Sequence, residues 1–158
     1  MTALKTRPAS AGTAYTDDFY TWTQEQGARL RAGDVSGLDR ENLADEIESL
    51  GRSQFASLVS ALRVVLLHML KIDCDTIGQR RSWAIAIILN RRLAADEIEE
   101  SPGLRRRLSE AIRRAYRDAR LQAADEIGLS VDRIPESCPY TDGDILDRPF
   151  PIDPDEAA

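Results

Sequence analysis

Apolar residues recur at helical spacing along most of the chain, and no segment with the period of two that marks a half-buried strand stands out. In residues 53–72 the main apolar stripe comprises Phe55, Leu58, Val59, Leu62, Leu66, Met69 and Leu70. Val64 and Leu67 fall on the opposite side of the same helix. A helix that is apolar on both sides is usually surrounded by others. This segment is therefore predicted to be the central helix of a bundle.

Further helices are predicted before and after the central one. The first covers residues 17–33, and the second begins at Asp39, which can cap its N-terminus. Gly51 is either the C-terminal cap of this second helix or a tolerated interruption before the central helix. A helix over residues 80–99 follows. The last long helix, 101–127, opens with a serine and a proline, an order that suits a helix N-terminus.

The pattern changes after residue 128. Five prolines exclude a long helix in this part: Pro135, Pro139, Pro149, Pro151 and Pro154. The segment is nevertheless too apolar for a purely disordered tail. We expect an extended strap (residues 129–158) with one helical turn at 141–146. The predicted architecture is all-α: a bundle of four to five helices over residues 15–128, a flexible lead-in at 1–14, and a proline-rich strap that docks on the bundle and ends in mobile residues.

Length and composition are those of one soluble domain. The 158 residues are 42% hydrophobic and 30% charged, and no apolar run approaches the roughly 18 residues of a membrane span. The N-terminus has no continuous apolar region, so no signal peptide is predicted. Cys74 and Cys138 are the two cysteines and form no CxxC motif. We expect a cytoplasmic protein without contact to a membrane.

The net charge of −6 is unevenly distributed. Residues 80–120 hold eleven arginines and six acids, whereas residues 121–158 hold two arginines and ten acids. The arginines could contact phosphates. However, their positions along the predicted helices place them on different faces, and a nucleic-acid binder normally has a net basic domain. Pairing with the acidic strap is the simpler interpretation. If they bind a partner instead, the candidates are Arg91, Arg92, Arg106, Arg113 and Arg117.

Four carboxylates lie within residues 41–48, but helical geometry separates them. At about 100° per residue, Leu43, Ile47 and Leu50 define the buried direction. Three of the acids point well away from it toward solvent. Only Glu46 lies about 60° from the centre of the apolar stripe, at the core boundary. An ion pair with an arginine such as Arg81 is the first interpretation of Glu46, and a role in chemistry is the second.

His68 is the only histidine and lies on the second face of the predicted central helix. A core histidine with one hydrogen bond is the simpler interpretation, and a metal or acid–base role is the alternative. A di-iron bundle needs Glu-x-x-His motifs, but residue 65 is a valine. No metal, cofactor or nucleophile motif is recognised, so no catalytic residue, metal or cofactor is assigned beyond the candidates Glu46, His68 and Arg81.

Several short motifs, in their combination and order, resemble one bacterial family. They are Tyr15-x-Asp17-Asp18-Phe19-Tyr20-x-Trp22, Leu30-Arg31-Ala32-Gly33, Asn42-Leu43-Ala44-x-Glu46-Ile47-Glu48-Ser49-Leu50-Gly51-Arg52-Ser53, Leu66-Leu67-His68-Met69-Leu70-Lys71, Arg81-Ser82-Trp83 and Cys138-Pro139-Tyr140-Thr141. Together they resemble the uncharacterised helical proteins known as domain of unknown function 29, over residues 14–147. The resemblance implies an all-helical cytoplasmic bacterial protein and no particular activity. It departs at residues 72–75, where family members often carry aromatic residues and glutamine.

These observations favour a protein-interaction or accessory module that docks a partner protein through its arginine-rich face or its strap. The absence of a strong catalytic signature and the segregated charge support this hypothesis. The first alternative is a hydrolase or metal-dependent enzyme centred on Glu46 and His68, with Arg81 as an anion clamp. The second is nucleic-acid binding through the arginines of residues 80–120.

Overall fold

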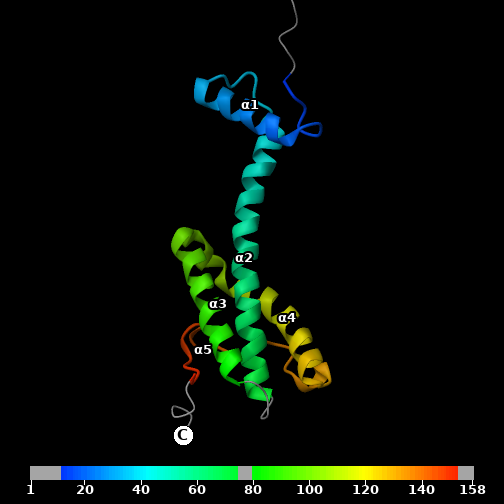
Figure 1. Ribbon diagram of the computed structural model, residues 1–158, viewed down its shortest axis with the longest axis vertical. Coiled ribbons are helices and arrows are strands. Elements are labelled where there is room, and N and C mark those ends of the chain that lie inside the picture. Colours follow the sequence, from blue (N-terminus) through cyan, green and yellow to red (C-terminus); the bar gives the residue numbers. More distant parts are fainter. Residues whose placement is uncertain (1–11, 75–79, 153–158) are drawn as a thin grey trace, which may run out of the picture. The chain divides into compact units, whose positions relative to one another are not determined.

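The computed structural model describes residues 12–74 and 80–152, and its regular elements are all helices (Figure 1). No strand occurs in these two ranges, which confirms the all-α prediction. The chain divides into two compact units, residues 1–50 and 51–158, and each is described by itself below. The flexible lead-in and the mobile last residues expected from the sequence lie largely outside the described residues.

Five α-helices and two short 3-10 helices make up the described chain. The α-helices are α1 (Phe19–Ala32), α2 (Arg40–Cys74), α3 (Arg80–Glu100), α4 (Leu108–Ile127) and α5 (Asp142–Asp147). The 3-10 helices are η1 (Pro102–Arg107) and η2 (Val131–Arg133). The predicted four to five helices are thus confirmed, and α5 coincides with the helical turn expected near residues 141–146.

In the first unit, α1 has a defined cap at each end. The Asp18 carboxylate accepts a hydrogen bond from the Thr21 backbone N–H at 3.0 Å, which satisfies an otherwise unpaired donor. Gly33 ends the helix with a φ of 73°, in the left-handed region that glycine enters without strain. Trp22 is buried on the inner face of α1, and its indole N–H donates to the Asp39 carboxylate at 3.2 Å.

Helix α2 is continuous from Arg40 to Cys74, so the two helices predicted on either side of Gly51 are one. Gly51 is not a C-terminal cap, because it does not take the positive φ of one. The alternative of an interruption between two helices is also wrong, since the helix continues through this glycine. A glycine inside a helix costs about 1 kcal/mol relative to alanine. The hydrogen bonds of the flanking turns outweigh a penalty of that size.

By length and composition alone, α2 is also long and apolar enough to cross a membrane. Its most apolar stretch of 18 residues has a mean hydropathy of 1.7. The sequence nevertheless contains no uninterrupted apolar run of 18 residues. Within the structure, 56% of this stretch is buried against other residues. The core helix of a soluble bundle has the same properties, so the stretch is only a weak indication of a membrane span.

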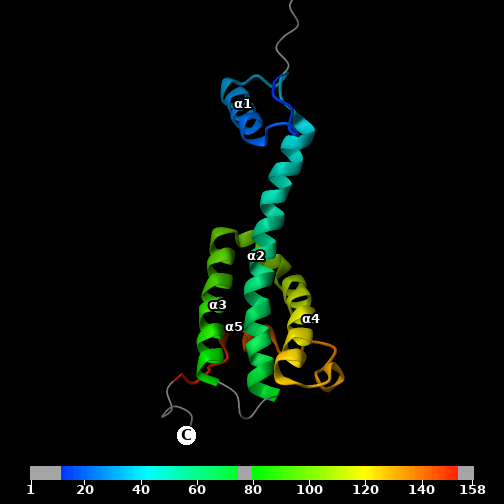
Figure 2. The same cartoon turned by 45° about the vertical axis from the view of Figure 1, so that its right-hand side comes forward.

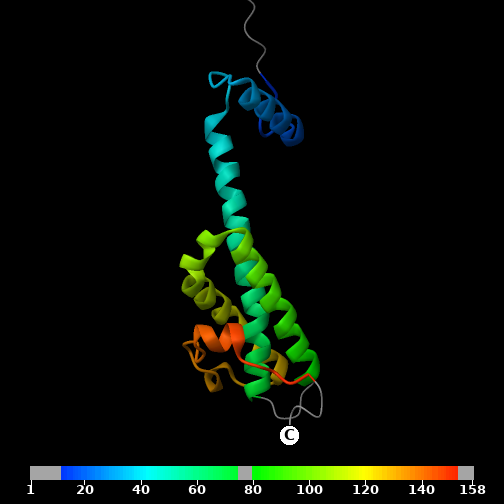
Figure 3. The ribbon, with the colours of Figure 1, turned by 90° about the vertical axis from the view of Figure 1, so that its left-hand side faces the viewer.

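The core of the second unit is built around residues 51–74 of α2. Figures 1, 2 and 3 all show α3 and α4 alongside this part of α2. The predicted central stripe is buried: Leu58, Leu62 and Leu66 are fully inaccessible to solvent. On α4 the inner face is made mainly of small residues, namely Ala111, Ala115, Ala119 and Ala123, all 0% exposed. Small side chains allow the backbones of α4 and its neighbours to approach closely.

Candidate functional site

His68 on α2 lies close to two charged residues of the second unit, Lys71 and Glu126. The His68 ring lies 6.5 Å from the Trp83 ring on α3, and the two planes differ by 25°. Its Nδ1 is buried and has no hydrogen-bond partner among the described residues. Burial lowers the pKa of His68 below 6.5, the Lys71 charge lowers this pKa further, and Glu126 opposes both effects. The imidazole is therefore neutral at pH 7.

Lys71 lies one turn after His68 on α2 and is buried, with an exposed fraction of 8%. Its Nζ donates to Oε2 of Glu126 on α4 at 2.6 Å. The same ammonium group lies 4.5 Å from the centroid of the Trp83 ring, within the range of a cation–π contact. The hydrogen bond from Lys71 lowers the pKa of Glu126. Lys71 thus connects all three long helices of the unit.

A hydrogen-bonded chain extends from this pair toward the surface. Gln122 donates to the second carboxylate oxygen of Glu126 at 2.9 Å and accepts from Arg63 at 2.6 Å. The charged ends of the cluster are therefore matched by neighbours, and the Nδ1 of His68 is the group left without a partner. Across the described ranges, no group of three or more His, Cys, Asp or Glu side chains is placed to hold a metal ion.

The structure gives the sequence candidates Glu46, His68 and Arg81 different neighbours. Glu46 belongs to the first unit, where its Oε1 accepts a hydrogen bond from the Tyr15 hydroxyl at 2.6 Å. This contact raises the pKa of Tyr15. Arg81 is exposed near the start of α3 and makes no ion pair within the residues that the structure describes. Within the second unit, no contact among the described residues joins Arg81 to His68.

Arg91 of α3, a candidate for partner binding, is used within the second unit. Its guanidinium donates to the backbone carbonyls of Asp144, Ile145 and Arg148 at 2.8, 2.7 and 2.7 Å. These groups belong to α5 and its C-terminal end, where carbonyls lack partners inside the helix. Arg91 therefore fixes α5 on α3 through main-chain atoms and not through the acidic side chains of the strap.

A second arginine holds the beginning of the strap in the same way. Arg120 of α4 donates to the carbonyls of Val131 and Ile134, both at 2.9 Å. Tyr116, one turn earlier, donates its hydroxyl to the Pro135 carbonyl at 2.6 Å. Burial raises the pKa of Tyr116 to about 12, so the hydroxyl stays protonated and keeps donating this bond.

The other four predicted partner-binding arginines are all exposed: Arg92, Arg106, Arg113 and Arg117. Arg117 forms an ion pair with the neighbouring Asp118 at 3.3 Å. Sequence reasoning missed that Arg107 and Arg114 lie 3.7 and 5.3 Å from the centroid of the buried Phe55 ring. Nothing in the sequence pattern marked these two arginines, because Phe55 lies far from both of them along the chain.

In the first unit, α1 and the beginning of α2 form an apolar groove with a volume of 290 Å³. Leu43, Ile47 and Leu50 were expected to be buried, but Ile47 is 66% and Leu50 71% exposed. The expectation was wrong because an apolar stripe is buried only where another element covers it, and α1 covers only part of this one. The α1 wall of the groove includes Phe19 and Leu30, about half exposed.

Comparison with known proteins agrees with the motifs read from the sequence. The family model of a domain of unknown function, DUF29, matches residues 14–151, so the chain belongs to this family. No curated protein and no solved structure matches the chain significantly. The family carries no assigned activity, and the helical fold of this member comes from the structure described above.

Proposed function

We propose that this protein is a protein-interaction module whose first unit binds an amphipathic helix of a partner. The groove between α1 and the start of α2 carries this proposal, because it gathers large apolar side chains that are exposed. Phe19, Leu30, Ile47 and Leu50 all line it, with exposed fractions between 49% and 71%. Exposed apolar patches with polar edges mark interaction sites on proteins.

The shape of the groove suits a helix rather than a compact small molecule. Its two walls are helices, and a third helix that lies against both would bury their apolar faces by ordinary helix packing. A partner helix would present apolar residues at positions i, i+3, i+4 and i+7. The buried Trp22 at the base of the groove would change its fluorescence when the groove is filled.

Charge indicates that the partner helix is basic. Residues 12–50 contain nine acidic residues and three arginines. Glu46 lines the groove itself, and its second carboxylate oxygen, Oε2, is not used in the bond from Tyr15. Lysine or arginine on the edges of the partner's apolar face would meet this negative field and speed association.

The test uses synthetic helices with one apolar face and either lysine or glutamate at the flanking positions. The lysine peptide is expected to bind the whole chain and to change Trp22 fluorescence, with weaker binding at high salt. Leu50→Glu removes an apolar side chain from the groove and replaces it with a carboxylate that the apolar face of the peptide would have to bury. This should weaken binding by tenfold or more despite the added negative charge, since about 1.4 kcal/mol is tenfold in affinity.

Val35→Glu is the matched control for this variant. Val35 is 60% exposed, belongs to the same unit and does not line the groove, so the control adds the same charge elsewhere. Its affinity for the peptide should match that of the unmodified protein. Equal loss in both variants, or tighter binding of the glutamate peptide, contradicts the proposal. With both variants as baits, partners in a native lysate are those captured by Val35→Glu and lost by Leu50→Glu.

A further inference from the structure

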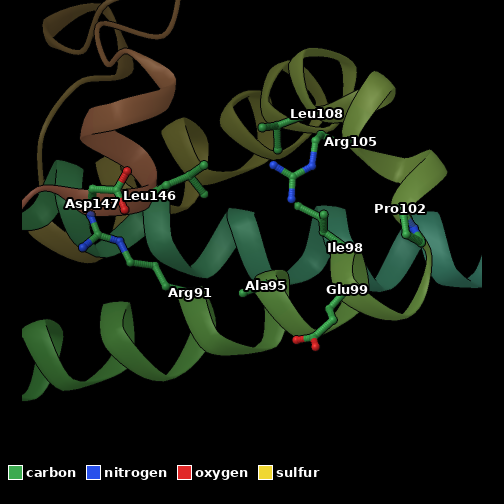
Figure 4. Close-up of a pocket in the computed structure, with 9 residues that line it drawn as sticks. All are labelled: Arg91, Ala95, Ile98, Glu99, Pro102, Arg105, Leu108, Leu146 and Asp147. Carbon is green, nitrogen blue, oxygen red and sulfur yellow. The ribbon is translucent and has the colours of Figure 1, made fainter.

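A second concave site lies in the other unit, between α3, η1, the start of α4 and α5. Its volume is 610 Å³, within the range of roughly 300–1,000 Å³ that is usual for small-molecule sites. Figure 4 shows Ile98, Leu108 and Leu146 around its middle, from three different helices. These side chains give the site an apolar body that could accept hydrocarbon.

The outer wall of this site is fixed in place. Leu146 and Asp147 belong to α5, and the three hydrogen bonds from Arg91 hold α5 on α3. Ile145, the neighbour of Leu146, is fully buried in the core and anchors the same turn. The cavity is therefore preformed, which lowers the entropy cost that a ligand would otherwise meet on binding.

Among the charged side chains that line the cavity, those at the α5 end have neighbours that compensate their charge or hydrogen-bonding groups, whereas Arg105 at the η1 end does not. Arg91 is satisfied by carbonyls, and the Asp147 carboxylate next to it opposes the fall in the pKa of Arg91 that burial causes. The Glu99 carboxylate points away from the cavity in Figure 4. Arg105 of η1 extends toward Ile98 in the same view, and it has no hydrogen bond or ion pair within residues 12–74 and 80–152.

Arg105 differs from Arg107 in having no partner for its guanidinium in the described ranges, and from Arg106 in lining the cavity. Arg107, two residues later, pairs with Glu110 at 2.9 Å and lies against Phe55. Arg105 instead offers its planar donor group at the edge of an apolar cavity. A guanidinium binds a carboxylate through two parallel hydrogen bonds, and such charge-assisted bonds are roughly twice as strong as neutral ones.

From this geometry we infer that the cavity binds an organic monoanion: Arg105 holds the carboxylate, and Ile98, Leu108 and Leu146 cover a hydrocarbon body. The site lies outside the groove of the first unit, and it would give the protein a small-molecule ligand in addition to a protein partner. A medium-chain fatty acid has this chemistry, and decanoate is a suitable probe.

Calorimetric titration of the full chain with decanoate tests the inference. The unmodified protein should bind decanoate and should bind decyltrimethylammonium, a cation with the same chain length, at least about tenfold more weakly. Arg105→Gln should weaken decanoate binding by about tenfold or more, because it removes a charge-assisted bond. Arg105 is exposed, so this change should leave the fold intact, which circular dichroism can verify.

Arg106→Gln is the matched control, since Arg106 is exposed and is not part of the cavity wall. It removes the same charge one residue away and should bind decanoate like the unmodified protein. Absence of decanoate binding overturns the inference, as does equal binding of the cation or equal affinity in the two glutamine variants. Loss of binding in Leu50→Glu instead of Arg105→Gln would place the probe in the groove and would also overturn it.

Discussion

Lys71 of α2 and Glu126 of α4 form an ion pair of 2.6 Å in the second unit, and Lys71 is buried while the Glu126 side chain is one-third exposed. A lysine in this position needs a partner, because an unpaired charge in the core is costly. The contact of its ammonium group with Trp83 adds to the attraction. Lys71 therefore links α2 to both α4 and α3.

The two partners of this ion pair should differ in their response to substitution. Glu126→Gln leaves Lys71 buried without a counter-charge and should lower the free energy of unfolding by about 1–3 kcal/mol. Lys71→Met removes the buried charge and leaves the more exposed carboxylate, so its cost should be smaller. Urea denaturation of both single variants and the double variant gives the coupling energy. A coupling below about 0.5 kcal/mol would show that the pair contributes little to stability.

Stability should fall when the solution is made acidic, starting near neutral pH, because of His68. Its pKa is lowered in the folded protein, so the unfolded chain binds a proton at a higher pH, near 6.5, than the folded one. The stability that the folded protein gains by keeping His68 neutral is complete above pH 6.5 and is lost as the pH falls through the pKa of His68 in the folded state. Glu126, with a pKa lowered from 4.5, adds a loss in a more acidic range.

Urea midpoints measured between about pH 5 and 7.5 separate these two groups. His68→Phe keeps a ring against Trp83 and removes the titrating nitrogen, so its midpoint should change less over this range. At pH 7 the variant should be as stable as the unmodified protein or more stable, because the unpaired Nδ1 is gone. Parallel pH profiles for the two proteins would exclude His68 as the cause.

Arg91 should be needed for the position of α5. Arg91→Lys keeps the charge but cannot donate to three carbonyls in a fixed plane, so two carbonyls lose their donor. We expect a loss of about 1–3 kcal/mol in unfolding free energy and faster amide hydrogen exchange in residues 142–148. Arg92→Lys, on the exposed side of the same helix, should stay within about 0.5 kcal/mol. Unchanged exchange in Arg91→Lys would refute the role.

Two glycines should respond in opposite directions to alanine. Gly51 lies inside α2 with nothing within 4 Å of an added Cβ, so Gly51→Ala should raise stability by about 0.5–1 kcal/mol. Gly128 ends α4 with a φ of 67°, and Gly128→Ala should lower stability by about 1–2 kcal/mol through backbone strain alone. Thermal melts followed by circular dichroism measure both changes.

Gly103 provides the control for Gly128, because an added Cβ would also meet nothing within 4 Å there. It differs in not having a positive φ, so Gly103→Ala should have little effect. If Gly103→Ala and Gly128→Ala reduce the melting temperature equally, the strain argument fails.

Much of the fold follows from local patterns in the sequence. The buried stripe of residues 55–70, the cap at Gly33 and the end of the last long helix at Gly128 depend on neighbours within a few positions. The motifs that identify the family are likewise short stretches of neighbouring residues, and they need no tertiary contact to be recognised. The break predicted at Gly51 was wrong, since a glycine weakens a helix locally but does not decide whether it ends.

The polar contacts follow from tertiary structure alone. Lys71 and Glu126 are 55 positions apart, and Arg91 reaches carbonyls more than 50 residues away. Hydrogen bonds act over about 3 Å and depend on direction, so sequence spacing cannot indicate which distant groups will meet. For that reason the arginines predicted to pair with acidic side chains turned out, at Arg91 and Arg120, to bind main-chain carbonyls.

Tertiary structure also decides which apolar residues are exposed to solvent. Helical periodicity gives the direction in which Ile47 and Leu50 point, and that direction is the same whether or not another helix lies there. In the first unit α1 covers only part of the stripe, so both residues are exposed in a groove. The sequence by itself determined which residues form helices and which faces are apolar. The packing of those helices decided which faces are covered, because burial depends on contacts between residues that are distant along the chain.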